Sequence, residues 1–220
     1  MKKVILILGT ALLTVMMCSS FGQSPKEVSI GSQVWMVENL NVDKFRNGEP
    51  VPQAKSAEEW KLAGDNKQAA WCYYNNKAAN GEKYGKLYNW YAVNDTRGLA
   101  PAGWHIPSVE EWKALEDYLG GYQEAGNKMK TSSGWKKDSK IGGGSGTNES
   151  GFSGLPGGIR YYHVTFDQLG FGGDWWSSTE GGKTFESDAM TVGLGYLSGQ
   201  SLSGGGSLKE NGLSVRCVRD

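Results

Sequence analysis

The chain has 220 residues, and its 23 basic side chains balance its 23 acidic ones. This balance gives no electrostatic reason to expect a nucleic acid or an anionic membrane surface as a partner. The length suits one large domain or two small ones, and 33 glycines, about twice the usual share, indicate many loops and turns.

Residues 1–22 have the pattern of a secretory signal peptide. Two lysines give a basic start, an apolar stretch follows as far as Met17, and small residues precede Gln23. The apolar stretch is too short for a stable membrane span. We expect cleavage near Gly22 and a secreted, periplasmic or cell-surface protein. The alternative is a lipid anchor on Cys18, and only such an anchor would bring the chain into contact with a membrane.

Export changes what is expected of the two remaining cysteines, Cys72 and Cys217. In an oxidising compartment they could form one disulfide, which would stabilise the chain by about 4 kcal/mol because it closes a long loop. The alternative is a pair of buried free thiols. No cysteine and histidine spacing in the chain is typical of zinc.

The first elements follow a short linker at residues 23–27. Residues 28–41 alternate and contain β-branched side chains, which predicts a strand or hairpin with its turn at Gly31-Ser32. Ser56 with Glu59 forms a capping box and predicts a short helix over residues 56–64.

The next stretch, residues 71–95, is rich in aromatic residues, asparagine and glycine. Its aromatic residues are too irregularly spaced for one helical stripe. We expect a strand, a turn at Asn80-Gly81, and then a short helix or strand over residues 87–93.

The clearest element begins after Pro107. Ser108 and Glu111 form a second capping box, and apolar residues recur at i, i+3 and i+7 from Trp112. This pattern predicts a helix with one apolar face, which two glycines at positions 120 and 121 end.

The second half of the chain predicts short elements separated by glycines. Residues 125–135 favour a short helix and a turn, and residues 141–152 form a polar glycine loop. Residues 210–220 alternate and predict a terminal strand with one apolar side. Strands that start and stop, with two or three short helices, indicate an α+β fold.

Seven ordered motifs carry a family resemblance that runs from about residue 28 to the end. The chain resembles the Fibrobacter succinogenes major paralogous domain family through NLN (39–41), YGKLYNWYAV (84–93), PAGWHIPSVEEW (101–112), MKTSSGW (129–135), GFSGLPGG (151–158), WWSSTE (175–180) and SVRCVRD (214–220).

This resemblance implies one domain over residues 28–220 with a C-type lectin-like fold, close to the formylglycine-generating type, in an exported bacterial surface protein. Family members often have Cys-Pro where this chain has Ala100-Pro101, which weakens any transfer of a disulfide pattern. Residues 174–212 also resemble the variable ligand-binding face of some proteins of this fold.

Catalysis has little support in the sequence. His105 lies between Trp104 and Ile106 just before a capped helix, so we expect a structural histidine bonded to the backbone. Formylglycine-generating chemistry needs two nearby cysteines in the C-terminal part, and this chain has only Cys217 there. We therefore expect no enzyme and no catalytic residues.

No cofactor is expected, although a structural calcium is one option. Asn94-Asp95, Asn148-Glu149 and Asp167 offer hard oxygen ligands. Ordinary turn residues explain the same side chains equally well, because asparagine and aspartate favour turns.

We expect a surface that binds a glycan or a protein through the C-terminal loops. One residue of the Trp175-Trp176 pair should be core and the other partly exposed, because neighbours on a strand point to opposite faces. Small, polar and aromatic loop residues suit an adaptable binding surface. The alternatives are a structural surface or fimbrial component, or an enzyme derived from this fold. The candidate ligand-binding residues are Trp176, Glu180, Phe185, Asp188, Tyr196, Ser198 and Gln200.

Overall fold

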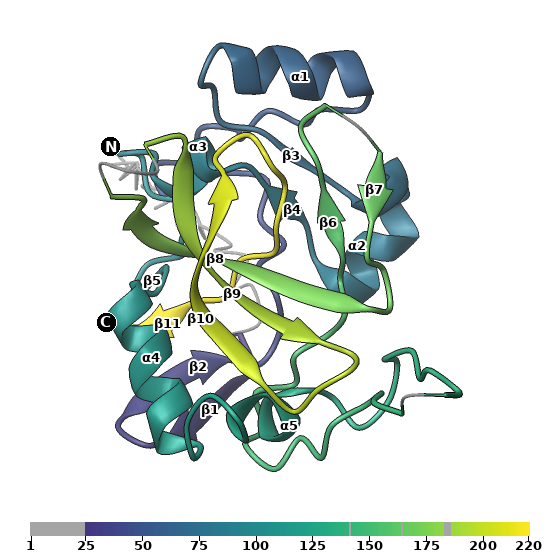
Figure 1. Cartoon of the computed structure of the whole chain (residues 1–220). Helices are drawn as coiled ribbons and strands as arrows, with labels where there is room; N and C mark the ends of the chain where they lie inside the picture. Colours follow the sequence, from purple (N-terminus) through teal and green to yellow (C-terminus); the bar gives the residue numbers. More distant parts are fainter. Residues whose placement is uncertain (1–24, 141, 164, 183–185) are drawn as a thin grey trace, which may run out of the picture.

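The computed structural model describes residues 25–140, 142–163, 165–182 and 186–220, which form a mixed α and β structure of short antiparallel sheets and few helices (Figure 1). The predicted signal peptide, Cys18 and Phe185 lie outside the described residues. In the described part, no helix is long and apolar enough to cross a bilayer. The helices are α1 (Ala57–Asp65), the 3-10 helix η1 (Tyr74–Asn76), α2 (Ala78–Tyr84), α3 (Trp90–Val93), α4 (Val109–Tyr118) and α5 (Ala125–Met129). The strands are β1 (Glu27–Ile30), β2 (Gln33–Met36), β3 (Trp71–Cys72), β4 (Leu87–Tyr88), β5 (Trp104–His105), β6 (Ile159–Arg160), β7 (Phe166–Asp167), β8 (Gly172–Glu180), β9 (Asp188–Gly195), β10 (Ser201–Leu208) and β11 (Val218–Arg219).

The two ends of the domain meet in one four-stranded sheet of order β1-β2-β11-β5. The predicted hairpin is confirmed as β1 and β2, joined at Gly31-Ser32. The last strand, β11, pairs with Trp35 of β2 on one side and with β5 on the other. The C-terminus is therefore an interior strand of the sheet.

Three longer strands, in the order β10-β9-β8, form the second sheet and cross the middle of the molecule in Figure 1. Trp175 and Trp176 on β8 are both fully buried, each in a different core cluster. The expectation that one of them is exposed is wrong, because core packs on both faces of the strand.

The two helices with capping boxes are confirmed. Ser56 and Glu59 cap α1, and Ser108 and Glu111 cap α4, with both hydrogen bonds of each box present. The predicted turn at Asn80-Gly81 is wrong, since these residues lie inside α2. Gly81 is required there for close packing: a Cβ would come within 2.1 Å of the Tyr73 ring.

Of the two alternatives for Cys72 and Cys217, the structure has the buried free thiols and not the disulfide. Cys72 and Cys217 are free thiols with no exposed surface, and they lie in separate core clusters. Burial raises the pKa of the Cys72 thiol to about 11 and that of Cys217 to about 12. Both thiols are therefore protonated and serve as core side chains.

The C-terminal segment is buried on both sides, not on one as its alternation predicts. Leu213, Val215 and Cys217 enter the core, and Ser214 and Arg216 on the other side are also buried. Arg216 can be buried because neutral oxygens surround its guanidinium and accept its hydrogen bonds.

Candidate functional site

Three of the predicted ligand-binding residues, Tyr196, Ser198 and Gln200, line one hollow of about 470 Å³ at the turn between β9 and β10. The other predicted residues lie elsewhere. Trp176 is wrong as a ligand-binding residue, because it is fully buried and its Nε1 donates to the Tyr88 carbonyl at 2.7 Å.

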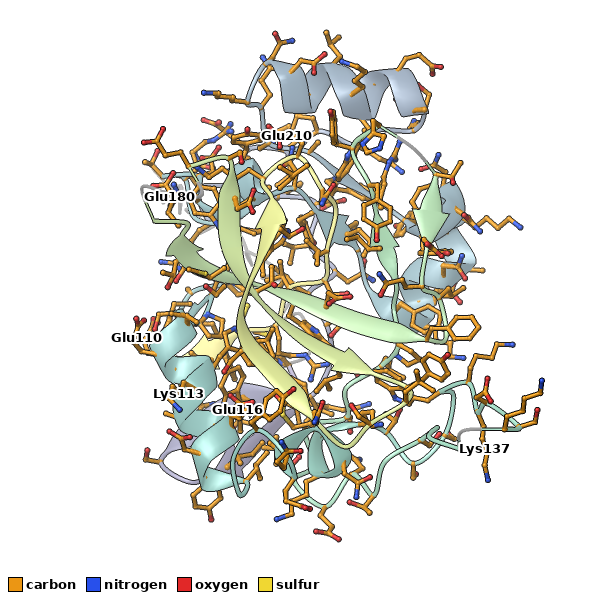
Figure 2. The ribbon with its side chains drawn as sticks, in the orientation of Figure 1. Glu110, Lys113, Glu116, Lys137, Glu180 and Glu210 are labelled. Carbon is orange, nitrogen blue, oxygen red and sulfur yellow. The ribbon has the colours of Figure 1, made fainter. Side chains whose placement is uncertain are left out.

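Glu180 and Asp188 lie at the opposite end of the β8–β9 pair from Tyr196. The Glu180 carboxylate accepts from the ammonium of Lys209 at 2.5 Å, and it lies at the edge of the molecule in Figure 2. Asp188 lines a separate hollow of about 350 Å³. The structure therefore divides the predicted set between two ends of the sheet.

The hollow beside Tyr196, called the aromatic hollow below, has an apolar rim. Five large apolar side chains are exposed in the described part of the chain, and three of them, Tyr122, Phe171 and Leu197, line this hollow. The Phe171 and Tyr196 rings meet edge to face with their centroids 5.0 Å apart. A concentration of exposed aromatic surface around a concave site is typical of ligand binding.

A buried lysine holds the turn that carries Tyr196. The Lys130 ammonium donates to the carbonyls of Gly195 at 3.1 Å, Ser198 at 2.7 Å and Gly144 at 3.1 Å. Burial lowers the pKa of Lys130. Three carbonyl partners on two segments make Lys130 a positioning residue for this side of the hollow.

The polar side of the hollow is also fixed. Gln200 accepts from the Tyr122 hydroxyl at 3.0 Å and donates to Gln123 at 2.9 Å. Gly126 of α5 lies against the same turn, where a Cβ would come within 2.1 Å of the Gln200 carbonyl. The hollow is therefore preformed by α5 and its neighbours.

Asp174 of β8 supplies the charge of the site. It lines both the aromatic hollow and the adjoining Asp188 hollow. Within the described residues, its carboxylate has no hydrogen-bond or ion-pair partner. Burial raises the pKa of the Asp174 carboxyl to about 6. A partly buried carboxylate without a protein donor is costly, and such costs are typical of functional sites.

We expect Asp174→Asn to stabilise the chain. The carboxyl titrates near 3.8 when exposed and near 6 when folded, so its charge opposes folding increasingly as the pH rises from about 4 to 6. The amide removes this cost and should raise the free energy of unfolding at pH 7 by roughly 1–3 kcal/mol. Urea unfolding between pH 4 and pH 7 measures it. An equal effect at pH 4 and pH 7 would contradict the burial of this charge.

Another hollow, of about 540 Å³, lies between α1 and the loops around residues 68 and 95. Three of its charged side chains are already satisfied within the protein. Glu59 caps α1, and Asp95 pairs with Arg97 at 2.7 Å. This hollow is larger than the aromatic one, but these three side chains already have partners within the protein, so none is left unpaired for a ligand.

His105 lies between two carboxylates. Its Nε2 is 2.8 Å from Glu111 Oε1 and its Nδ1 is 2.8 Å from Asp220 Oδ1. The expectation of a backbone partner is wrong, because the helix cap Glu111 and the last residue both point at the ring. Partial burial lowers the pKa of His105, but the hydrogen bonds to Glu111 and Asp220 outweigh it, so the pKa lies above its ordinary value. When protonated, the ring donates to both carboxylates and ties the chain end to the start of α4.

This arrangement predicts that the contribution of His105 to stability fades as the pH rises. A pKa raised by folding gives its full stabilisation below the unfolded value of about 6.5 and loses it as the pH rises through the folded value. We expect His105→Gln to lower the free energy of unfolding by up to about 1 kcal/mol at pH 5, a modest value because the ring is partly exposed, and by less at pH 9. Asp220→Asn removes the negative charge of one partner, so in urea titrations it should show part of the same pH-dependent loss of stability. A difference that does not change with pH would contradict the two ion pairs.

Three of the five candidate calcium ligands already have partners within the protein. Asp95 pairs with Arg97, Asn148 bonds to Ser153, and Asp167 accepts from the Gln168 amide. Across the described ranges, no three histidine, cysteine or acidic side chains gather as a metal site.

Sequence reasoning missed Asp174, Phe171 and Lys130. Asp174 had a usable signal, since it is a charged residue directly before two tryptophans. Phe171 stands between glycines, which conceals any periodicity. Nothing in the sequence marked Lys130 as a buried positioning residue, because an isolated lysine is usually exposed to solvent.

Comparisons with known proteins give the family of the chain. Neither the curated proteins nor the solved structures gave a match. The family model of the Fibrobacter succinogenes major domain matches residues 28–219. Because this match spans nearly all of the chain after the predicted signal peptide, the chain belongs to the Fibrobacter succinogenes major domain family.

Proposed function

We propose that this chain is an exported, non-catalytic binding domain of C-type lectin-like fold that recognises a glycan at a bacterial cell surface through the aromatic hollow. The support for export is the signal-peptide pattern of residues 1–22. The mature protein would be either free or anchored by a lipid on Cys18. The support for binding is the aromatic hollow itself.

The observation that carries the proposal is that an exposed ring, Phe171, and a partly buried ring, Tyr196, lie beside an unpartnered acid. Phe171 and Tyr196 offer apolar faces on which a sugar ring can stack, and Asp174, Ser198 and Gln200 offer polar atoms beside them. Binding sites combine such apolar surface with a few placed polar groups. A volume of about 470 Å³ is in the range of small-ligand sites.

The surroundings of His105 support the enzyme alternative less well than the aromatic hollow supports binding. Both of its nitrogens face carboxylates at 2.8 Å, so neither is free to accept a proton from a substrate. We therefore assign His105 to the scaffold.

A glycan array with the purified chain tests the proposal. We expect binding to at least one glycan class, and we expect Phe171→Ala and Tyr196→Ala each to weaken it at least tenfold because the stacking surface is lost. Tyr118→Ala is the matched control, since Tyr118 is 67 % exposed but lies on α4 and not in the hollow.

Circular dichroism separates lost binding from lost folding in each variant. No binding across the array, or binding that Tyr118→Ala weakens as much as Tyr196→Ala, would overturn the proposal. Binding only to proteins would show that the ligand class is wrong.

A further inference from the structure

Acceptor oxygens converge in the aromatic hollow without donors to match them. A Cβ built at Gly172 would lie 2.4 Å from Gln168 Oε1 and 3.5 Å from Asp174 Oδ2. A Cβ at Gly193 would lie 2.9 Å from Asp174 Oδ1. The two glycines therefore leave the space into which both the carboxylate and the amide oxygen reach. Such a pair of acceptors calls for a ligand group that donates several hydrogen bonds.

The charge of the surroundings specifies that donor further. No lysine or arginine among the described residues lines the aromatic hollow or the Asp188 hollow. The titratable groups that share these hollows with Asp174 are Asp188, Tyr122, Tyr161 and Tyr196, of which none is a cation at any pH. The charge of Asp174 is therefore left for a ligand to neutralise.

We propose that the aromatic hollow selects amino sugars, an inference that rests on the proposed function. The ligand's ammonium group would bind Asp174 and Gln168, and a sugar ring would lie against Phe171 and Tyr196. An ammonium group donates three hydrogen bonds, and the nearby aromatic faces also attract a cation. Pairing it with Asp174 would neutralise the carboxylate that the protein itself leaves unpaired.

A sugar suits the hollow better than a lysine side chain does. A lysine would bring its ammonium on a narrow flexible stem and leave the rim of Tyr122, Phe171 and Leu197 uncovered. An amino sugar carries its ammonium on a rigid ring, which covers the aromatic surface and also presents hydroxyl groups to Ser198 and Gln200. Less conformational freedom is then lost on binding.

Isothermal titration of the purified chain with two matched trisaccharides tests this inference. Glucosamine and N-acetylglucosamine trimers share their rings and differ in the free amino group. We expect at least tenfold tighter binding of the glucosamine trimer near pH 6.8. Asp174→Asn keeps the shape of the side chain and should abolish that preference. Gly193→Ala should weaken glucosamine binding because its methyl group displaces Asp174, whereas Gly182→Ala, which has open space at its Cβ and lies outside the hollow, should not.

The outcomes separate this inference from the proposed function. Equal binding of both trimers that remains sensitive to Tyr196→Ala would overturn the amino-sugar preference and leave glycan binding standing. A preference that Asp174→Asn retains would overturn the role of Asp174. A trilysine peptide that binds as tightly as the glucosamine trimer would overturn the choice of a sugar. Failure of every glycan would end both proposals.

Discussion

Replacing Arg216 with methionine should destabilise the chain by roughly 3–5 kcal/mol, the largest effect we expect from a single polar residue. The guanidinium is fully buried and donates to the side chain of Asn39 and to the carbonyls of Met36, Val37 and Phe152. Methionine would fill much of the volume but leave several buried acceptors without donors. Each such loss is costly because water cannot replace the missing donor. Urea unfolding measures the effect.

The matched control is Arg219→Met, three residues later. Arg219 is partly exposed and pairs with Glu27, so its loss should cost about 1 kcal/mol or less. Arg216→Lys keeps the charge but lacks the forked geometry that reaches four groups, and it should fall between the two. If Arg216→Met and Arg219→Met cost the same, the buried network does not contribute as described.

Arg216 also illustrates where sequence reasoning ends. Local signals worked well: the capping boxes of α1 and α4 and the turn at Gly31-Ser32 are all confirmed. They depend on residues three or four positions apart, so a single sequence displays them fully. The alternation before Arg216 predicted a strand buried on one face only. It could not reveal the buried arginine, because most of the oxygens that accept from its guanidinium lie about 180 residues away in the chain. Contacts at that separation leave no periodic trace.

The candidate site was predictable only where its residues lie close together in the sequence. Tyr196, Ser198 and Gln200 lie in one turn, so a prediction that this turn binds a ligand included all three. Glu180 was included because it lies near them in the sequence. The antiparallel hairpin instead places Glu180 at the far end of β8 and brings Gly172 and Asp174 to that turn. Trp176 was misplaced because the sequence does not reveal that both faces of β8 are covered.

The tryptophans that fill this core give the second large prediction. Trp112 and Trp175 are fully buried in one cluster with their ring centroids 6.4 Å apart, and replacing either with alanine should cost about 3–5 kcal/mol. Replacing each tryptophan with phenylalanine also tests the contribution of the indole N–H to stability. Trp175 Nε1 donates to Asn39 Oδ1 at 2.8 Å, whereas the buried Trp112 Nε1 has no acceptor in the described part of the chain.

We therefore expect Trp175→Phe to destabilise the chain by about 1–2 kcal/mol more than Trp112→Phe in paired urea titrations. Both changes remove the same atoms from the same cluster, so their cavity costs should nearly cancel. What differs is that Trp175→Phe gives up a hydrogen bond, while Trp112→Phe removes a donor that is already unsatisfied. Asn39 Oδ1 also accepts from Arg216, so in an Arg216→Met background Trp175→Phe should cost more than it does alone. Equal costs for the two phenylalanine variants would mean that Trp112 Nε1 finds an acceptor, such as a buried water, in solution.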